Sequence, residues 1–239
     1  MPGLLIPLEN FSTSDLLVSI VIQHVSDNQY HCGIIYKSEE DEERILHLAW
    51  NFKLRNTLIS ENQYGKYYFV NHNINMIRQM DMAAWLENIY RENINKIHYG
   101  LYYKHTYFEH KGIIRLGENE CGLTCATFVL AVFKSAGLEL IDLDNWPVRP
   151  DDLNWQDSLI NSIELLEPED KDYIKKLHKE KGCPRYKPQE VTASITFDNR
   201  PEHFLKIWEK GEIIKKELFI KNFLKIIGNL LEILSLINR

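Results

Sequence analysis

The first seventy residues alternate between short apolar runs and polar turns. The β-branched run 16–25 and the run 30–36 are separated by a polar turn, so together they predict a β-hairpin. Further strands are expected at 45–50 and, as a shorter one, at 67–70. Because no helical spacing lies between the first three runs, we expect an antiparallel meander in this part of the chain.

Helical spacing begins after residue 70. Asn73 is expected to cap a helix over about 74–90 whose apolar face is formed by Ile77, Met80, Ala84 and Trp85. A polar loop that contains glycine then leads into an apolar helix, which begins at Cys125 and ends before Gly137. Gly137 suits the positive φ that commonly follows the last turn of a helix.

The last hundred residues predict mainly helices. We expect them at 152–166, at 168–179, from Pro188 onward, and at 201–237 with an interruption near Gly211. The final segment carries an apolar row at three- and four-residue steps, formed by Ile220, Leu224, Ile227, Leu231 and Leu234. Charged residues break this row, so it does not predict a membrane span. We expect 202–238 to pack on the core or on a second copy; a partner-binding or membrane-surface helix is the alternative.

Composition narrows the class of protein. The chain has 239 residues, of which 44% are hydrophobic and 26% charged, with a net charge of −6. This length suits one large domain or one domain with a helical appendage. The link at 142–152, which contains Pro, Asp and Trp, is typical of a boundary, so we expect an α+β core at 1–141 and a mainly helical extension at 142–239. The acidic balance argues against a nucleic-acid partner. No Lys or Arg precedes Lys37, so we expect no secretory signal, a cytoplasmic location and reduced cysteines.

The strongest candidate for chemistry is Cys125. Thr124 is a suitable N-cap, which places Cys125 at the first helical position, where the helix dipole favours a thiolate. A thiol nucleophile also needs a base and a group that orients the base. His31 and His47 lie in neighbouring predicted strands, and a helix packed on that sheet would bring Cys125 to them. Cys121 is the competing nucleophile, although it precedes the helix.

Two motifs resemble those of circularly permuted papain-like enzymes. Cys125-Ala126-Thr127-Phe128-Val129 resembles their cysteine signature, and the segment Tyr30–Tyr36 resembles their histidine strand. The group includes permuted NlpC-type amidases, lecithin–retinol acyltransferases and PPPDE-type peptidases. The segment 45–49, with His47, resembles the second histidine strand of the acyltransferase branch. The resemblance covers about 16–140 and implies a papain-like core with His31 as base, Cys125 as nucleophile and His47 as orienting group.

The chain departs from the acyltransferase branch at two points. Thr124 stands where that branch has an asparagine, and the loop between the two histidines is longer. An unpermuted papain order is an alternative, with His178 or His203 as base, although fewer residues follow Cys125 than the roughly 130–150 that this order usually needs. A metal site with Cys121 and Cys125 is a further alternative, but the spacing is not typical of zinc. We expect Cys183 to be a bystander and Cys32 to be buried beside His31.

These residues predict a cysteine hydrolase that cleaves an amide or isopeptide bond in a protein or peptide. We expect the backbone N–H of Cys125 and the side chain of Asn119 to stabilise the oxyanion. The alternatives are a thiol acyltransferase or lipid hydrolase with the same residues, or a binding module that acts through its C-terminal helices. No motif calls for a cofactor or a metal, and we expect none.

Overall fold

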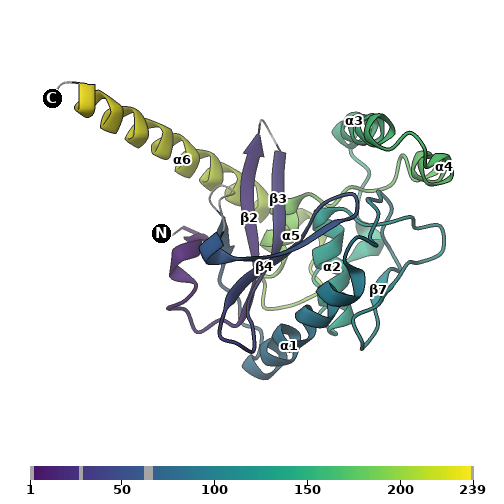
Figure 1. The fold of residues 1–239 in the computed structure, drawn as a ribbon, viewed down its shortest axis with the longest axis horizontal. Helices are drawn as coiled ribbons and strands as arrows, with labels where there is room; N and C mark the ends of the chain where they lie inside the picture. Colours follow the sequence, from purple (N-terminus) through teal and green to yellow (C-terminus); the bar gives the residue numbers. More distant parts are fainter. Residues whose placement is uncertain (1–2, 27–28, 62–66, 238–239) are drawn as a thin grey trace.

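The computed structural model describes residues 3–26, 29–61 and 67–237, and for residues 225, 226 and 228–237 it describes the helical backbone alone. The predicted turn at 26–29 therefore lies partly outside the described residues. The described part has an α+β fold in which helices flank an antiparallel sheet whose strands differ in length (Figure 1). The predicted α+β class is confirmed at this level.

The main sheet has the strand order β1-β6-β2-β3-β4-β5, with antiparallel pairing throughout. Its strands are β1 (Leu5–Pro7), β2 (Val18–Ser26), β3 (Gln29–Lys37), β4 (Glu43–Trp50), β5 (Lys53–Leu58) and β6 (Tyr68–Val70). The predicted hairpin and meander are confirmed as β2, β3 and β4. Strands β1 and β5 were not predicted, because β1 is very short and β5 has a polar pattern. A second, two-stranded sheet joins β7 (Tyr107–Phe108) to β8 (Ile114–Arg115).

Alternation along the strands divides the main sheet into two faces. One face carries Ile20, Cys32, Ile34 and Leu46, and it contributes to the large core with the helices. The opposite face carries Val21, Ile35, Ile45 and Phe69, which are covered in part by Leu8 and Phe11 from the N-terminal segment. The same opposite face also carries both candidate histidines, because His31 pairs with Gln23 and His47 pairs with Arg55 in register.

Helix α1 (Met76–Asn93) corrects the predicted helix at 74–90. Its N-cap is Asn75, not Asn73: the Asn75 side chain accepts a hydrogen bond from the backbone N–H of Ile77 at 2.8 Å. The predicted apolar face is also wrong, since Ile77 and Met80 are exposed. The buried face of α1 includes the polar residue Gln79. Its amide oxygen accepts the N–H groups of residues 17 and 18, so burying a polar side chain costs little here.

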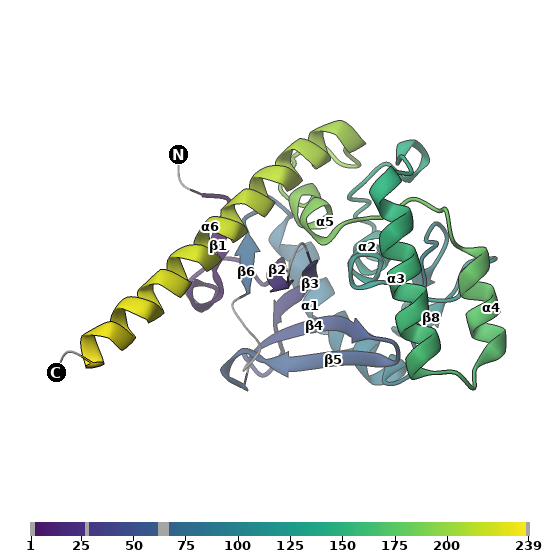
Figure 2. The ribbon, with the colours of Figure 1, turned by 90° about the horizontal axis from the view of Figure 1, so that it is seen from above.

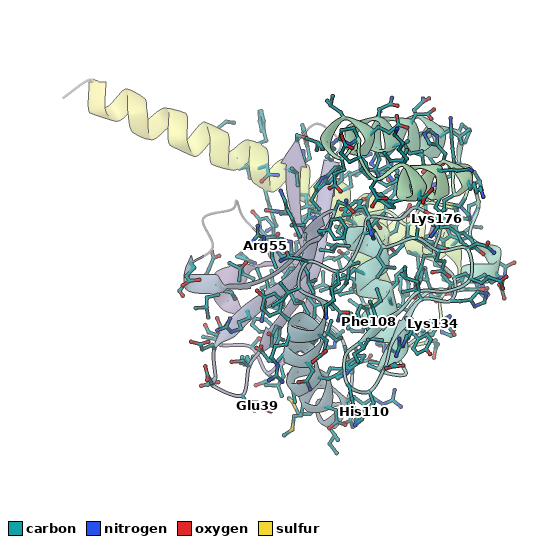
Figure 3. The ribbon with its side chains drawn as sticks, turned by 45° about the vertical axis from the view of Figure 1, so that its right-hand side comes forward. Glu39, Arg55, Phe108, His110, Lys134 and Lys176 are labelled. Atoms are coloured by element: carbon teal, nitrogen blue, oxygen red, sulfur yellow. The ribbon has the colours of Figure 1, made fainter. Side chains whose placement is uncertain are left out.

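Helix α2 (Cys125–Ser135) is buried over residues 125–133 and packs against β3, β4 and β7. Its apolar residues 128–133 are buried on all sides, as expected for a helix in the middle of the molecule. Phe108, which Figure 3 labels, packs edge-on against Phe128 and against Trp85 of α1, so it joins the two helices. Gly137 follows the helix with φ of +76°, which confirms the predicted helix end.

The C-terminal part forms helices α3 (Pro150–Leu166), α4 (Lys171–Lys179), α5 (Pro188–Ser194) and α6 (Phe204–Ile237). The short helix α5 packs against β2, β3 and α2, and α6 packs against α5. One apolar core therefore runs across residue 141, with Val129, Leu159 and Val191 in the same cluster. The division into 1–141 and 142–239 stays a prediction as a statement about domains, but the two parts share their core.

Helix α6 is continuous through Gly211, so the predicted interruption is wrong. A Cβ at Gly211 would lie 3.3 Å from the Cα of Glu190, which shows that glycine serves the close approach of α6 to α5. Farther along α6, the carboxylate of Glu217 accepts the backbone N–H groups of Leu4 and Leu5 at 2.9 and 3.2 Å. The helix thus holds the N-terminal strand, and beyond that point it extends past the body of the molecule (Figures 1 and 2).

The apolar row predicted for the last segment does not pack on the core where its side chains are described. Ile220 and Leu224 are exposed, while Ile214 and Leu218 are buried instead. Leu231 and Leu234 lie outside the described side chains. A search of the described helices finds none with the length and apolarity needed to cross a membrane.

Candidate active site

The N-terminus of α2 is built by a capping box. The Thr124 hydroxyl accepts the backbone N–H of Thr127 at 3.1 Å, and the Thr127 hydroxyl accepts the N–H of Thr124 at 2.7 Å. This confirms Thr124 as the N-cap and Cys125 as the first helical residue. The cap fixes the first turn, and the positive end of the helix dipole then lies at the sulfur of Cys125.

Strand β3 brings two side chains to Cys125. Cys32 and His31 are consecutive residues of β3, and α2 packs against this strand. The pairing of β3 with β4 ends at Ile34 and Leu46, which leaves the strand end at His31 free of β4. A hydrogen bond from the Cys32 thiol, and then the neighbouring His31, hold the pKa of the Cys125 thiol well below its ordinary value. Cys32 is buried beside His31, as expected, and desolvation raises the pKa of its own thiol.

His31 and His47 are joined directly. The Nε2 atom of His31 lies 2.7 Å from the Nδ1 atom of His47, and the two rings meet edge to face. Gly33 permits this approach, because a Cβ at Gly33 would lie 2.7 Å from the Cβ of His47. Since His31 uses Nε2 for His47, only its Nδ1 atom is left to meet the sulfur of Cys125.

His47 is suited to accept a hydrogen bond rather than to carry charge. Burial, followed by the charges of His31 and Arg55, lowers the pKa of His47 to about 3. The imidazole of His47 is therefore neutral at physiological pH. A neutral His47 can accept the Nε2 proton of His31, whichever protonation state His31 adopts during a reaction.

Tyr67 and Gln23 complete the polar side of the site. The Gln23 amide donates a hydrogen bond of 2.9 Å to the Tyr67 hydroxyl, and both side chains line the same cavity as Cys125. Burial and then the charge of Cys125 raise the pKa of Tyr67, so its hydroxyl keeps its proton. Because the hydroxyl already accepts from Gln23, its own proton is free to be donated elsewhere.

These groups line a cavity of about 690 Å³. One wall comes from the sheet, with Gln23, His31, His47 and Arg55, and from Tyr67, which immediately precedes β6. The other wall comes from the C-terminal part of the chain, with Trp155, Ser158, Leu159 and Ser162 of α3 and residues 185, 186 and 188 before and at the start of α5. The segment 142–239 thus supplies part of the candidate site as well as part of the core.

Cys121 has different surroundings from Cys125. Its backbone N–H donates a 2.7 Å hydrogen bond to the carboxylate of Glu180, which also accepts the N–H of Leu101 at 2.6 Å. Burial and then the Glu180 charge raise the pKa of the Cys121 thiol far above its ordinary value. Cys121 is absent from the described lining of the cavity. The geometry therefore favours Cys125 as the nucleophile.

Asn119 is not brought to the cavity. It is exposed, adopts φ of +65° in the loop before α2, and is not among the described residues that line the cavity. The loop turns so that the neighbouring Glu120 points inward, where its carboxylate accepts the backbone N–H groups of residues 104, 105 and 106. The geometry does not support Asn119 as an oxyanion donor. Burial and then the charge of Cys125 raise the pKa of Tyr99 well above its ordinary value. The backbone N–H of Cys125, the other expected oxyanion donor, lies beside the Tyr99 hydroxyl and opposes this rise.

The other candidates lie elsewhere. His178 pairs with Glu164 at 2.6 Å and His203 pairs with Asp142 at 3.3 Å, and neither is among the described residues that line the cavity. Cys183 lies beside Gln156, away from Cys125. Within the described ranges, no group of three or more His, Cys, Asp or Glu side chains is arranged to hold a metal ion.

Comparison of the chain with protein families, with curated proteins and with solved structures found no match. The functional interpretation therefore depends on the geometry of the site itself. Residues that the sequence did not single out are Gln23, Gly33, Tyr67 and the wall from α3 to α5. A glycine inside an apolar strand was the one available signal, since such a glycine often marks a close approach.

Proposed function

We propose that the chain is a cysteine hydrolase with a permuted papain-like core, acting on an amide or isopeptide bond. The observation that carries the proposal is the joined pair His31 and His47, with 2.7 Å between Nε2 and Nδ1, in the cavity that Cys125 also lines. Thiol catalysis requires a nucleophile, a base and a group that orients the base, and we assign these roles to Cys125, His31 and His47. The lowered pKa of the Cys125 thiol supports the assignment.

In the first half of the reaction, Nδ1 of His31 takes the proton of the Cys125 thiol. The thiolate sulfur then adds to the carbonyl carbon of the substrate, and the carbonyl oxygen becomes an oxyanion. As the oxyanion collapses, the carbon–nitrogen bond breaks and His31 gives its proton to the leaving nitrogen. Throughout, His47 accepts the Nε2 proton of His31 and keeps the ring aligned with the sulfur.

In the second half, water attacks the thioester. His31 removes a proton from the water, the carbon–sulfur bond breaks, and the acid leaves while the sulfur regains a proton. An amine or an alcohol in place of water would make the same site an acyltransferase. The oxyanion donor that we assign is the Tyr67 hydroxyl, because Gln23 holds its oxygen and leaves its proton unused.

The test is the alkylation rate of Cys125 by iodoacetamide as a function of pH, followed by peptide mass spectrometry. We expect a thiol that titrates well below the ordinary value of about 8.5 and a rate that falls by roughly tenfold or more in His31→Ala. His178→Ala is the matched control, since His178 is exposed and paired with Glu164, and it should change nothing. Ordinary thiol behaviour that is indifferent to His31 would refute the proposal.

A second measurement distinguishes a hydrolase, an acyltransferase and a binding module without activity. Peptide amides incubated with the protein, with and without hydroxylamine, should release free acid in its absence and a hydroxamate in its presence. Cys125→Ala should abolish both products. Product formation only with an added amine or alcohol would indicate an acyltransferase, and full activity in Cys125→Ala would exclude Cys125 as the nucleophile.

A further inference from the structure

The cavity around Cys125 has an unusual charge for an acidic protein. The whole chain has a net charge of −6. Yet the described residues that line the cavity include no Asp or Glu, and they include Lys53, Arg55 and Arg185. Within the described part of the chain, none of these three cations has a carboxylate within ion-pair distance. A cavity lined by one sign of charge attracts the opposite sign.

Arg185 is the most constrained of the three cations. Its guanidinium stacks on the Trp155 ring, 3.9 Å from the ring centroid. Its backbone carbonyl accepts hydrogen bonds from Arg149 at 2.7 Å and from the Trp146 indole at 3.1 Å. Both the main chain and the plane of the side chain are therefore held in place, and little conformational entropy is left to lose when a ligand binds.

The nearby carboxylates do not form ion pairs with the Arg185 guanidinium. Asp152 and Glu190 both receive hydrogen bonds from Arg149, which lies between α3 and α5. Burial lowers the pKa of Arg185 to about 10, so the guanidinium stays charged at neutral pH. Its N–H groups have no acceptor among the described residues, and a stacked guanidinium presents its donors at the edge, in the geometry that matches a carboxylate or phosphate.

We propose that Arg185 forms an anion subsite, which selects substrates carrying a carboxylate or phosphate group near the bond that is cleaved. The exposed Lys53 and Arg55, on β5 beside His47, add a general attraction at the rim of the cavity (Figure 3 labels Arg55). This inference rests on the proposed function, because the subsite gains its meaning from the neighbouring Cys125. The anion subsite narrows the class of substrates to acyl compounds that carry an anionic group.

The test uses affinity labels in pairs, one anionic and one neutral. Chloroacetyl-glycine, chloroacetyl-β-alanine and chloroacetyl-4-aminobutyrate are compared with their carboxamides, and chloroacetyl-phosphoethanolamine with chloroacetyl-ethanolamine. The inactivation constants KI and kinact at Cys125 are measured by mass spectrometry. At the spacer that reaches Arg185, we expect the anionic label to have a KI about 10–100-fold lower than its neutral counterpart. The anion with the lower KI shows whether the subsite prefers a carboxylate or a phosphate.

Variants assign the preference to Arg185. Arg185→Gln should reduce the preference to about twofold through KI, and Arg185→Lys, which keeps the charge without the fork, should restore part of it. Arg55→Gln removes the same charge from the rim and serves as the matched control. Arg55→Gln should have a smaller effect on the preference for anionic labels. This effect should vanish in about 0.5 M salt, because the screening length is then only about 4 Å.

The outcomes separate this inference from the proposed function. Unchanged labelling of Arg185→Gln by the neutral reagents shows that the variant is folded and its nucleophile intact. Rapid neutral labelling of the wild type without any charge preference, or a preference that survives in both Arg185 variants, would overturn the subsite alone. Slow labelling by every reagent, indifferent to His31, would overturn the proposed function.

Discussion

Cys121 and Cys125 lie in the same loop–helix junction, and both are almost fully buried, with exposures of 6% and 8%. Their thiols nevertheless have pKa values displaced in opposite directions. Burial alone raises the pKa of a thiol, so burial cannot explain the difference. What differs is the neighbouring group: the Glu180 carboxylate lies beside Cys121, whereas Cys32 and His31 lie beside Cys125.

The comparison also separates two uses of a buried polar group. Glu180 binds the backbone N–H groups of residues 101, 102 and 121, so it holds a loop in place. The His31–His47 pair instead lines a cavity together with the Cys125 thiol. The first arrangement is satisfied within the protein. In the proposed function, the second arrangement acts on a bound substrate.

The largest expected effect is the difference in reactivity between the two thiols. With iodoacetamide near pH 6, Cys125 should be alkylated at least about 100-fold faster than Cys121, because the thiolate is the reacting species. No Lys or Arg separates them, so they share a tryptic peptide, and the single variants Cys121→Ala and Cys125→Ala assign the signal. The fast reaction should survive in the first variant and disappear in the second. Comparable rates at both thiols would break the comparison.

Glu180→Gln tests whether the Cys121 side of the comparison is structural. The change removes a buried charge that accepts several backbone N–H groups, so we expect unfolding free energy to fall by about 2–3 kcal/mol in urea titrations. Glu164→Gln, on the exposed pair with His178, is the control and should cost less than about 0.5 kcal/mol. Equal losses in the two variants would show that Glu180 does not hold the loop.

His47 predicts a pH dependence of stability. Its pKa in the folded chain is about 3, whereas an unfolded histidine titrates near pH 6.5. Between these values the unfolded chain binds a proton that the folded chain does not, so stability falls as the pH is lowered. From pH 7.5 to 5 this contribution is about 1–2 kcal/mol, measured by urea unfolding. His47→Gln should lose less stability over the same interval; an equal loss would mean that His47 is not held neutral.

The smallest expected effect concerns the cap of α2. Thr124→Ala and Asp170→Ala each remove an N-cap side chain, and each should cost about 1 kcal/mol in thermal or urea unfolding. Only Thr124→Ala should also slow alkylation of Cys125, because the first turn of α2 positions its sulfur. A slower reaction in Asp170→Ala, on α4, would show that the effect reflects global stability instead.

Local signals predicted much of the secondary structure. Apolar runs identified β2, β3 and β4, and the Thr124 and Gly137 positions identified both ends of α2. The prediction for α1 failed at its apolar face, because Gln79 is buried by hydrogen bonds to a distant strand. The interruption expected in α6 failed because Gly211 serves packing against α5 and does not end the helix. Both errors come from contacts between segments far apart in the sequence.

The candidate site divides in the same way. The sequence alone singled out Cys125 as a helix-terminal thiol, and it singled out His31 and His47 as polar residues in apolar strands. These are properties of a residue and its near neighbours, which periodicity and capping determine. The 2.7 Å contact between the histidines, the Tyr67–Gln23 pair, the outward position of Asn119 and the wall around Arg185 were decided only by the tertiary structure. Each depends on which face of a strand or loop meets a segment distant in the sequence, and that choice is made when the whole core packs.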